Sequence, residues 1–133
     1  MIFKGKSIVK GYFKGEAIVS RQPISFLGGV DPESGIITEK GHELKGLSLS
    51  KKVLIIPHGK GSTVGSYVMY SLAKRGLAPG AIVTTSLDVM ILTGCVISNI
   101  PLISNVTEEI FSHVRNGSII EVDGSKGLIR LLR

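Results

Sequence analysis

The segment Pro57–Ser66, Pro-His-Gly-Lys-Gly-Ser-Thr-Val-Gly-Ser, holds the residue types best suited to chemistry in this chain. Its glycines allow the backbone to approach a ligand closely. A helix that begins near Ser62 would point free N–H groups and the positive end of its dipole at the same place. Lys60 adds a full positive charge. The segment therefore predicts a site for an anion such as a carboxylate, a phosphate or an alkoxide.

Two common phosphate-binding motifs do not fit this segment. A Walker A loop requires Ser or Thr directly after its lysine, but Gly61 follows Lys60. The dinucleotide-binding fingerprint requires a third glycine at the position where Val64 stands. The loop is therefore predicted to bind an anion in some other way, with Lys60 and the backbone N–H groups of Gly61 and Thr63 as the candidate substrate contacts.

Ser62 has two interpretations that the pattern leaves open. Serine is a preferred N-cap residue, so capping alone would explain its presence, although Gly65 stands where the Glu or Gln of a capping box would be. The second interpretation is a catalytic base. A free hydroxyl is a weak base, but a helix N-terminus and a nearby Lys60 would lower the cost of forming an alkoxide.

The elements around this loop predict a βαβ unit. Lys52–Ile56 is a continuous apolar run, which is typical of a strand buried on both faces. The helix from Ser62 ends at Gly76, a favoured residue after a helix, and Ala81–Thr85 forms the next strand. Helical spacing predicts a buried helix face made of Val64, Tyr67, Val68, Ser71 and Leu72.

The rest of the chain is predicted to be rich in strands around a glycine-rich loop at Gly28–Gly35. Two further helices are expected, Asp88–Ile97 with Asp88 near its N-cap, and a short one from Thr107. Short strands are expected at Ser7–Lys10, Glu16–Ser20, Ile36–Thr38, Pro101–Ile103, Ser118–Val122 and Leu128–Leu132. The prediction is one α/β domain over residues 1–133, with strands that run in mixed directions.

The composition of the chain argues against several classes of protein. The chain has 133 residues, 43% of them apolar, and a net charge of +6. Its basic residues are scattered and its aromatic residues few, which argues against nucleic-acid binding. It has no leader-like or membrane-length apolar run, so we expect a soluble cytoplasmic protein. Cys95 is expected to be a buried inert thiol, and three scattered histidines predict no metal site.

Several blocks of the sequence resemble the small subunit, or swivelling domain, of the aconitase X group. The loop Gly59–Ser62 after an apolar strand is the most specific of them. The similar blocks, which cover most of the chain in the same order, are Gly28–Gly35, Gly41–Gly46, Val53–Ser66, Gly76–Ile82 and Asn99–Leu102.

The resemblance implies a β/β/α swivelling-domain fold and assigns Ser62 the role of the family's catalytic serine, the proton acceptor. It also implies a larger aconitase-like partner subunit whose cysteines hold a [4Fe-4S] cluster. A separate short chain is similar to the archaeal two-subunit form of this group. That form dehydrates (R)-5-phosphomevalonate to trans-anhydromevalonate 5-phosphate in a modified mevalonate pathway of isoprenoid biosynthesis.

Two other interpretations remain. The chain could serve another dehydratase of the same group, one with a hydroxyproline-like substrate, although those enzymes tend to be single fused chains. It could instead be a non-catalytic swivelling carrier or binding module. Swivelling domains of that kind carry a phosphorylated histidine, for which His58 is the one candidate here.

Overall fold

The apolar run after Lys52 forms the centre of the sheet. It folds as β4 (Val53–Ile56), which is buried along its whole length, and it pairs in parallel with β3 (Tyr12–Val19) and β5 (Ala81–Thr84). The computed structural model describes all residues 1–133. Its eight strands follow the order β1-β8-β7-β3-β4-β5-β6-β2. The remaining strands are β1 (Ile2–Lys4), β2 (Lys6–Val9), β6 (Leu102–Ser104), β7 (Ile119–Asp123) and β8 (Leu128–Leu131).

Parallel and antiparallel pairs divide the sheet into two parts. β3, β4, β5 and β6 run parallel to one another, while β7, β8, β1 and β2 join through antiparallel pairs. β1 and β2 are separated by Gly5 alone, yet they stand at opposite ends of the strand order. The sheet therefore curls until its two ends meet beside Gly5.

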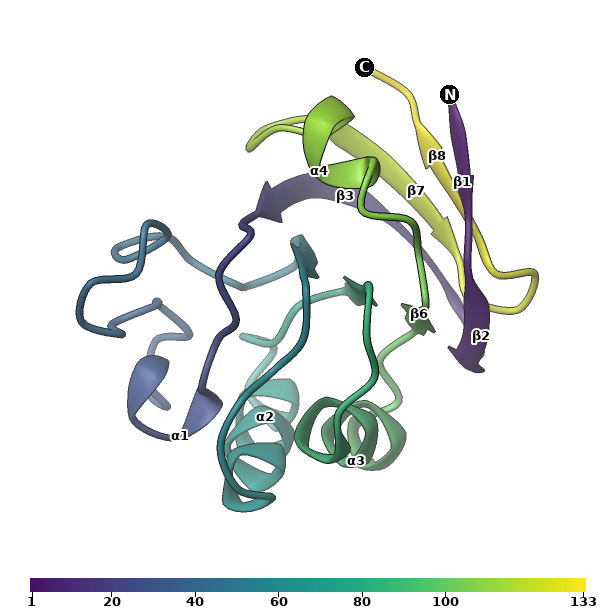
Figure 1. Ribbon diagram of the computed structural model, residues 1–133. Coiled ribbons are helices and arrows are strands. Elements are labelled where there is room, and N and C mark those ends of the chain that lie inside the picture. Colours follow the sequence, from purple (N-terminus) through teal and green to yellow (C-terminus); the bar gives the residue numbers. More distant parts are fainter.

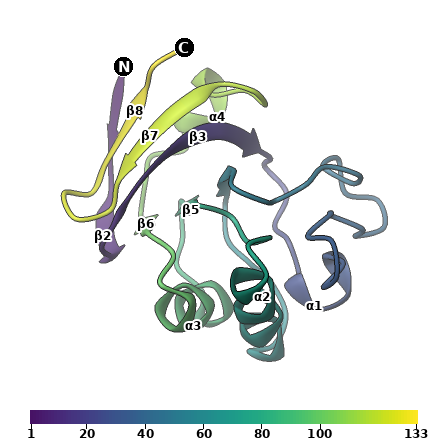
Figure 2. The ribbon, with the colours of Figure 1, turned by 180° about the vertical axis from the view of Figure 1, so that it is seen from behind.

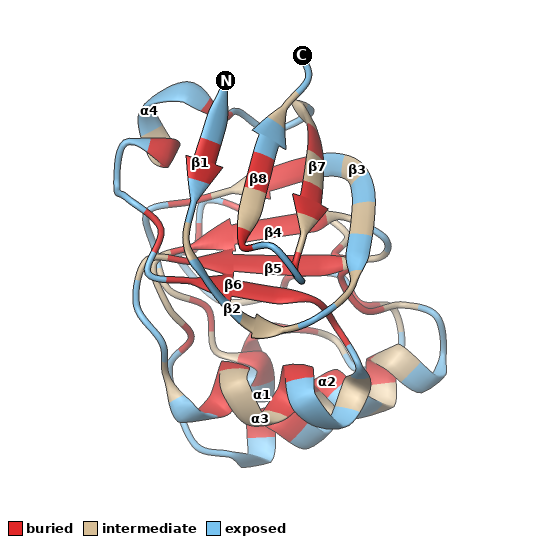
Figure 3. Ribbon diagram, turned by 90° about the vertical axis from the view of Figure 1, so that its right-hand side faces the viewer, coloured by how far each residue is buried: buried red, intermediate tan, exposed pale blue.

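Three layers result, two of strands and one of helices. Three of the four helices lie on one side of β4, β5 and β6, while the short helix Ile110–His113 lies with the strands β1, β7 and β8 on the other side (Figures 1 and 2). One apolar cluster fills each gap, and Figure 3 shows the buried central strands between them. The helices are α1 (Phe26–Gly29), α2 (Val64–Lys74), α3 (Val89–Ser98) and α4 (Ile110–His113). The predicted β/β/α layering and mixed strand directions are confirmed.

The central βαβ unit is also confirmed, because β4, α2 and β5 follow one another and the two strands pair in parallel. Other predictions were less accurate. Ile36–Thr38 forms isolated bridges in place of a strand. β3 begins at Tyr12, earlier than predicted, because its first half pairs with β7. Neither β1 nor the short, irregular α1 was predicted; β1 depends on pairing with β8, at the far end of the chain.

The predicted buried face of α2 was largely wrong. Val64 and Tyr67 are 51% and 63% exposed, although Leu72 is buried as predicted. Met90 of α3 explains the difference, because α2 turns small residues toward it. The ideal Cβ position of Gly65 lies 3.1 Å from Met90 Cγ, and Ser66 Oγ donates to the Met90 carbonyl at 2.7 Å. The residues of α2 that face the core are Gly65, Ser66, Met69 and Leu72.

Candidate active-site loop

The segment Pro57–Thr63 connects the end of β4 to the start of α2. It therefore lies at the carboxyl edge of the parallel strands, where open α/β sheets commonly bind ligands. Its first half is held by the chain that leads from β3 to α1. Gly59 forms a parallel bridge with Ile24, and Lys60 N donates to the Ile24 carbonyl at 3.0 Å. The backbone before Ser62 is thus fixed in position.

Asp88 ties this loop to the neighbouring helix. One carboxylate oxygen accepts from Gly59 N at 2.7 Å, and the other accepts from Ile91 N at 3.1 Å, which caps α3. Gly59 packs closely against α3, because an added Cβ would lie 2.5 Å from Met90 Cε and 2.7 Å from Ile91 Cγ1 and would displace these side chains. Gly61 has a φ of +95°, a conformation that glycine adopts at little cost. The two glycines therefore serve close packing and a sharp turn.

Glu39 is the partner of Lys60. Its Oε2 lies 2.8 Å from Lys60 Nζ, and its Oε1 accepts from Ser25 N at 2.9 Å. Burial by itself would raise the pKa of Glu39. The hydrogen bonds from Lys60 and Ser25, together with the charge of Lys60, outweigh burial and lower that pKa. Lys60 is therefore paired with a carboxylate, although 48% of its side chain remains exposed.

Ser62 lies exposed at the start of α2, between exposed Gly61 and exposed Thr63. Its Oγ accepts from Val64 N at 3.3 Å, a long hydrogen bond, and its carbonyl accepts from Gly65 N at 3.0 Å. Thr63 makes no side-chain capping bond. The hydroxyl of Ser62 thus contributes a weak cap and remains accessible, so the capping and catalytic interpretations are compatible.

The histidines play different parts. His58 Nδ1 lies 2.6 Å from the Gly59 carbonyl, so its ring packs against its own loop. His42 is buried and satisfied, since its Nδ1 accepts from Leu44 N at 3.0 Å. Neither histidine forms a hydrogen bond with the Ser62 hydroxyl, and no histidine–acid arrangement for a hydrolase is formed.

An iron–sulfur cluster does not fit the side chains of this chain. Such clusters are held by several cysteine thiolates, whereas Cys95 is the one cysteine and is fully buried in α3. Burial strongly raises the pKa of its thiol, so it stays protonated. Nowhere do three or more His, Cys, Asp or Glu side chains gather as a metal site would require.

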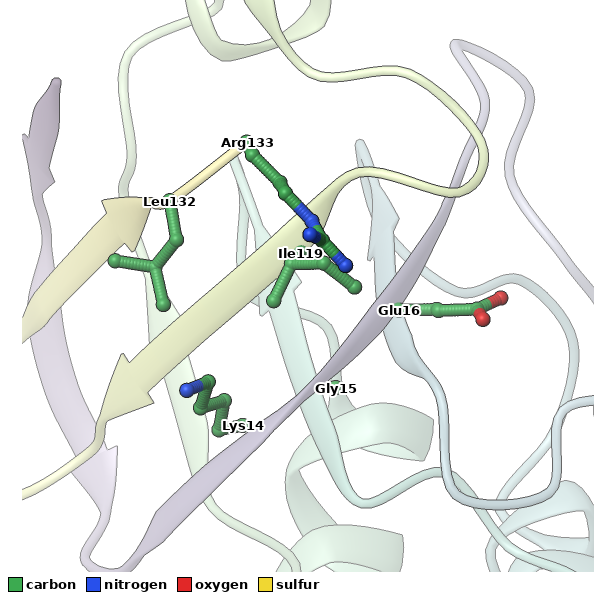
Figure 4. Close-up of a pocket in the computed structure, with 6 residues that line it drawn as sticks. All are labelled: Lys14, Gly15, Glu16, Ile119, Leu132 and Arg133. Carbon is green, nitrogen blue, oxygen red and sulfur yellow. The ribbon is translucent and has the colours of Figure 1, made fainter.

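The largest hollow of the molecule, about 580 Å³, lies elsewhere (Figure 4). It is a surface depression beside β3, β7 and the C-terminal residues, and none of its lining residues belongs to the loop Pro57–Thr63. The lining residues are Lys14, Gly15, Glu16, Ile119, Leu132 and Arg133. Cavity size therefore does not locate the site in this chain.

Sequence reasoning missed two residues that shape the loop. Asp88 was predicted as a helix cap, but its second bond, to Gly59, joins segments that are distant in the sequence. Glu39 follows an irregular stretch with no periodic pattern, and nothing in the sequence pairs it with Lys60. A half-buried acid beside a basic loop is visible only once the chain is folded.

These features define a class. The family model described as aconitase X swivel domain matches residues 2–131, and the chain belongs to that family. A crystal structure of Thermococcus kodakaraensis aconitase X in its holo-form has a chain that superimposes with a TM-score of 0.94 at 44% identity, over 100% of this chain and 99% of that one. A UPF0107 protein solved by solution NMR gives a TM-score of 0.91 at 40% identity, over 100% of both chains.

Relatives in the same family carry a more specific name. A phosphomevalonate dehydratase small subunit from Methanosarcina acetivorans is 47% identical over 98% of this chain and 90% of its own length. The protein of that name from Thermococcus kodakarensis is 46% identical over 99% of this chain and 97% of its own length. No helix of the structure has both the length and the apolar character needed to cross a membrane.

Proposed function

We propose that this chain is the small subunit of a cytoplasmic phosphomevalonate dehydratase, and that Ser62 is its proton acceptor. The names of its relatives support the reaction. The observation that carries the assignment of Ser62 is its exposed hydroxyl at the start of α2, on a loop fixed by Asp88 and Glu39. The substrate is (R)-5-phosphomevalonate and the product trans-anhydromevalonate 5-phosphate.

The loop supplies the groups needed to remove a proton from a carbon atom of the substrate. Ser62 Oγ, as the alkoxide, takes a proton from the carbon next to the substrate carboxylate and becomes a neutral hydroxyl, while the hydroxyl on the neighbouring carbon leaves as hydroxide, and the C=C bond forms. The positive end of α2 stabilises negative charge on Oγ. The exposed N–H groups of Gly61 and Thr63, and the exposed half of Lys60, provide contacts for the anionic substrate. Glu39 keeps Lys60 in place until the substrate arrives.

A second subunit completes this site. A large aconitase-like subunit holds the [4Fe-4S] cluster, because this chain lacks the cysteines for it. The iron of such a cluster, held by the large subunit, would supply Lewis-acid assistance to the leaving hydroxyl. Docking of that subunit over Ser62 also removes water, which strengthens the electrostatic effects of the loop.

The test is anaerobic reconstitution with the large subunit, followed by an assay of phosphomevalonate dehydration. We expect turnover from the complex and none from this chain alone. Ser62→Ala should reduce turnover by roughly 100-fold or more while the complex still assembles. His58→Ala is the matched control from the same loop and should leave the complex with most of its activity.

Three outcomes would contradict the proposal. A cluster-loaded complex that ignores phosphomevalonate but dehydrates a hydroxyproline-like acid would change the substrate. Turnover that survives Ser62→Ala would remove Ser62 as the base. Loss of function on His58→Ala alone would favour a carrier domain with a phosphorylated histidine.

A further inference from the structure

The surfaces of α2 and α3 that face away from the sheet are unusually apolar. We call this surface the α2–α3 apolar face. All six of its residues are between 39% and 63% exposed. They are Val64, Tyr67 and Tyr70 on α2, with Val89, Val96 and Ile97 on α3. The outer stripe of a surface helix is normally polar, so this arrangement requires an explanation.

The distribution of residues around α2 is also unusual for a surface helix. Val64, Tyr67 and Tyr70 point outward, while Gly65 and Ser66 face the core together with Met69 and Leu72. Hydrophobic spacing predicted that Val64 and Tyr67 would be buried, and within this chain they are not. A stripe with the composition of a buried face, exposed in the isolated chain, is what a subunit interface leaves when its partner is absent.

The face also contains a hollow suited to a partner's side chain. Tyr67, Tyr70 and Ile97 alone line a depression of about 410 Å³ between the two helices. Tyrosine is enriched in interface cores and at the residues that contribute most to binding, and charged residues are depleted there. Lys74, at the end of α2, is the one charged residue of the two helices, and its ammonium lies 5.5 Å from the centre of the Tyr70 ring.

We infer that the α2–α3 apolar face docks the large subunit that carries the cluster, an inference that rests on the proposed function. The face begins at Val64, two residues after Ser62, so a partner that presents a cluster to Ser62 must cover the start of α2. Charge favours that partner over a second copy of this chain. Two copies would each bring a net charge of +6, and this charge repels them from one another.

The test measures binding of the purified large subunit to variants of this chain, by calorimetric titration under anaerobic conditions. Tyr67→Glu and Ile97→Lys should each weaken binding roughly tenfold or more, because each puts a charge into the apolar hollow. Ile2→Glu and Ile2→Lys are the matched controls. Ile2 is 52% exposed on β1, a strand on the far side of the molecule from α2 and α3 (Figure 1), so both Ile2 variants should bind as wild type does.

Circular dichroism of each variant alone establishes that it is folded, and hydrogen exchange gives a second measurement on the wild-type complex. Amides of α2 and α3 should exchange more slowly in the complex than in the free chain. Unchanged exchange there would overturn the docking surface even if a variant failed to fold.

The outcomes separate the two proposals. If wild type binds the large subunit and the face variants bind equally well, the docking surface is wrong and the proposed function stands. If wild type does not bind at all, the proposed function fails and the docking surface fails with it. If the free chain is a dimer that Tyr67→Glu converts to a monomer, the face belongs to a second copy, which also overturns the inference.

Discussion

The two helices that follow β4 and β5 begin in different ways. α3 begins at Asp88, whose two carboxylate oxygens accept from Ile91 N and from Gly59 N of the neighbouring loop. α2 begins after Ser62, whose Oγ makes one long bond of 3.3 Å to Val64 N. Both starts lie at the same edge of the sheet. The start of α3 is capped by a side chain with a structural role, whereas the start of α2 has only a weak cap.

The N-termini of α2 and α3 therefore have different roles. Asp88 uses both oxygens to hold the backbone of two segments, which is a structural role. The hydroxyl of Ser62 contributes little to the helix and is exposed, so it is available for chemistry. Asp88 at the start of α3 also stabilises the start of α2, because it fixes Gly59, three residues before Ser62. Each of the following substitutions tests one side of this division.

The largest effect on stability is expected from Asp88→Ala. It removes the cap of α3 and leaves the buried N–H of Gly59 without an acceptor, at a cost of roughly 1–3 kcal/mol of unfolding free energy. Urea denaturation measures this loss. Asp88→Asn, which retains an acceptor oxygen, should recover part of it. A wild-type midpoint for Asp88→Ala would show that the α3 start is not the structural one.

Glu39→Gln should have a smaller effect that depends on pH. The pKa of Glu39 is lowered in the folded chain, so its contribution is complete above the ordinary value of 4.5 and is lost as pH falls through the lowered value. We expect the variant to be less stable than wild type by about 1 kcal/mol at pH 7. The two proteins should converge in stability once the pH falls below the lowered pKa of Glu39. Denaturation curves across this range measure the difference, and a constant gap would contradict the pairing with Lys60.

The smallest change is expected in the unfolding free energy of Ser62→Ala. An exposed hydroxyl with one long hydrogen bond contributes less than about 0.5 kcal/mol. Thermal denaturation of the free chain measures it, with Thr63→Ala as the adjacent control. A loss above about 1 kcal/mol would make Ser62 a true helix cap and weaken the contrast with Asp88.

Local signals predicted the centre of the fold well. The apolar runs that became β4 and β5, the glycine that ends α2 and the capping position of Asp88 depend on near neighbours in the chain. Propensity and hydrophobic spacing capture such effects. The location of the candidate site at the loop before α2 followed from the same signals together with the family resemblance.

The features that the sequence did not predict depend on contacts between residues that are distant in the sequence. The inward face of α2 depends on how closely Gly65 approaches Met90, and hydrophobic spacing ranks Tyr67 as a better core residue than glycine. The Lys60–Glu39 pair joins the loop to an irregular stretch with no periodicity. Lys60 was expected as a cation for the substrate, and its carboxylate partner came only from the three-dimensional arrangement.

The curled sheet has a consequence for how the chain is made. Ile2 pairs with Arg130, and Lys6 pairs with Ser104. During synthesis, β1 and β2 therefore cannot pair until β8 and β6 have been made. Contacts this distant in sequence slow folding. Until β6 and β8 are made, β2 and β1 lack these partners and present open hydrogen-bonding edges to other chains. Closure at Gly5 is therefore a late step, and it is the one that removes the risk of aggregation.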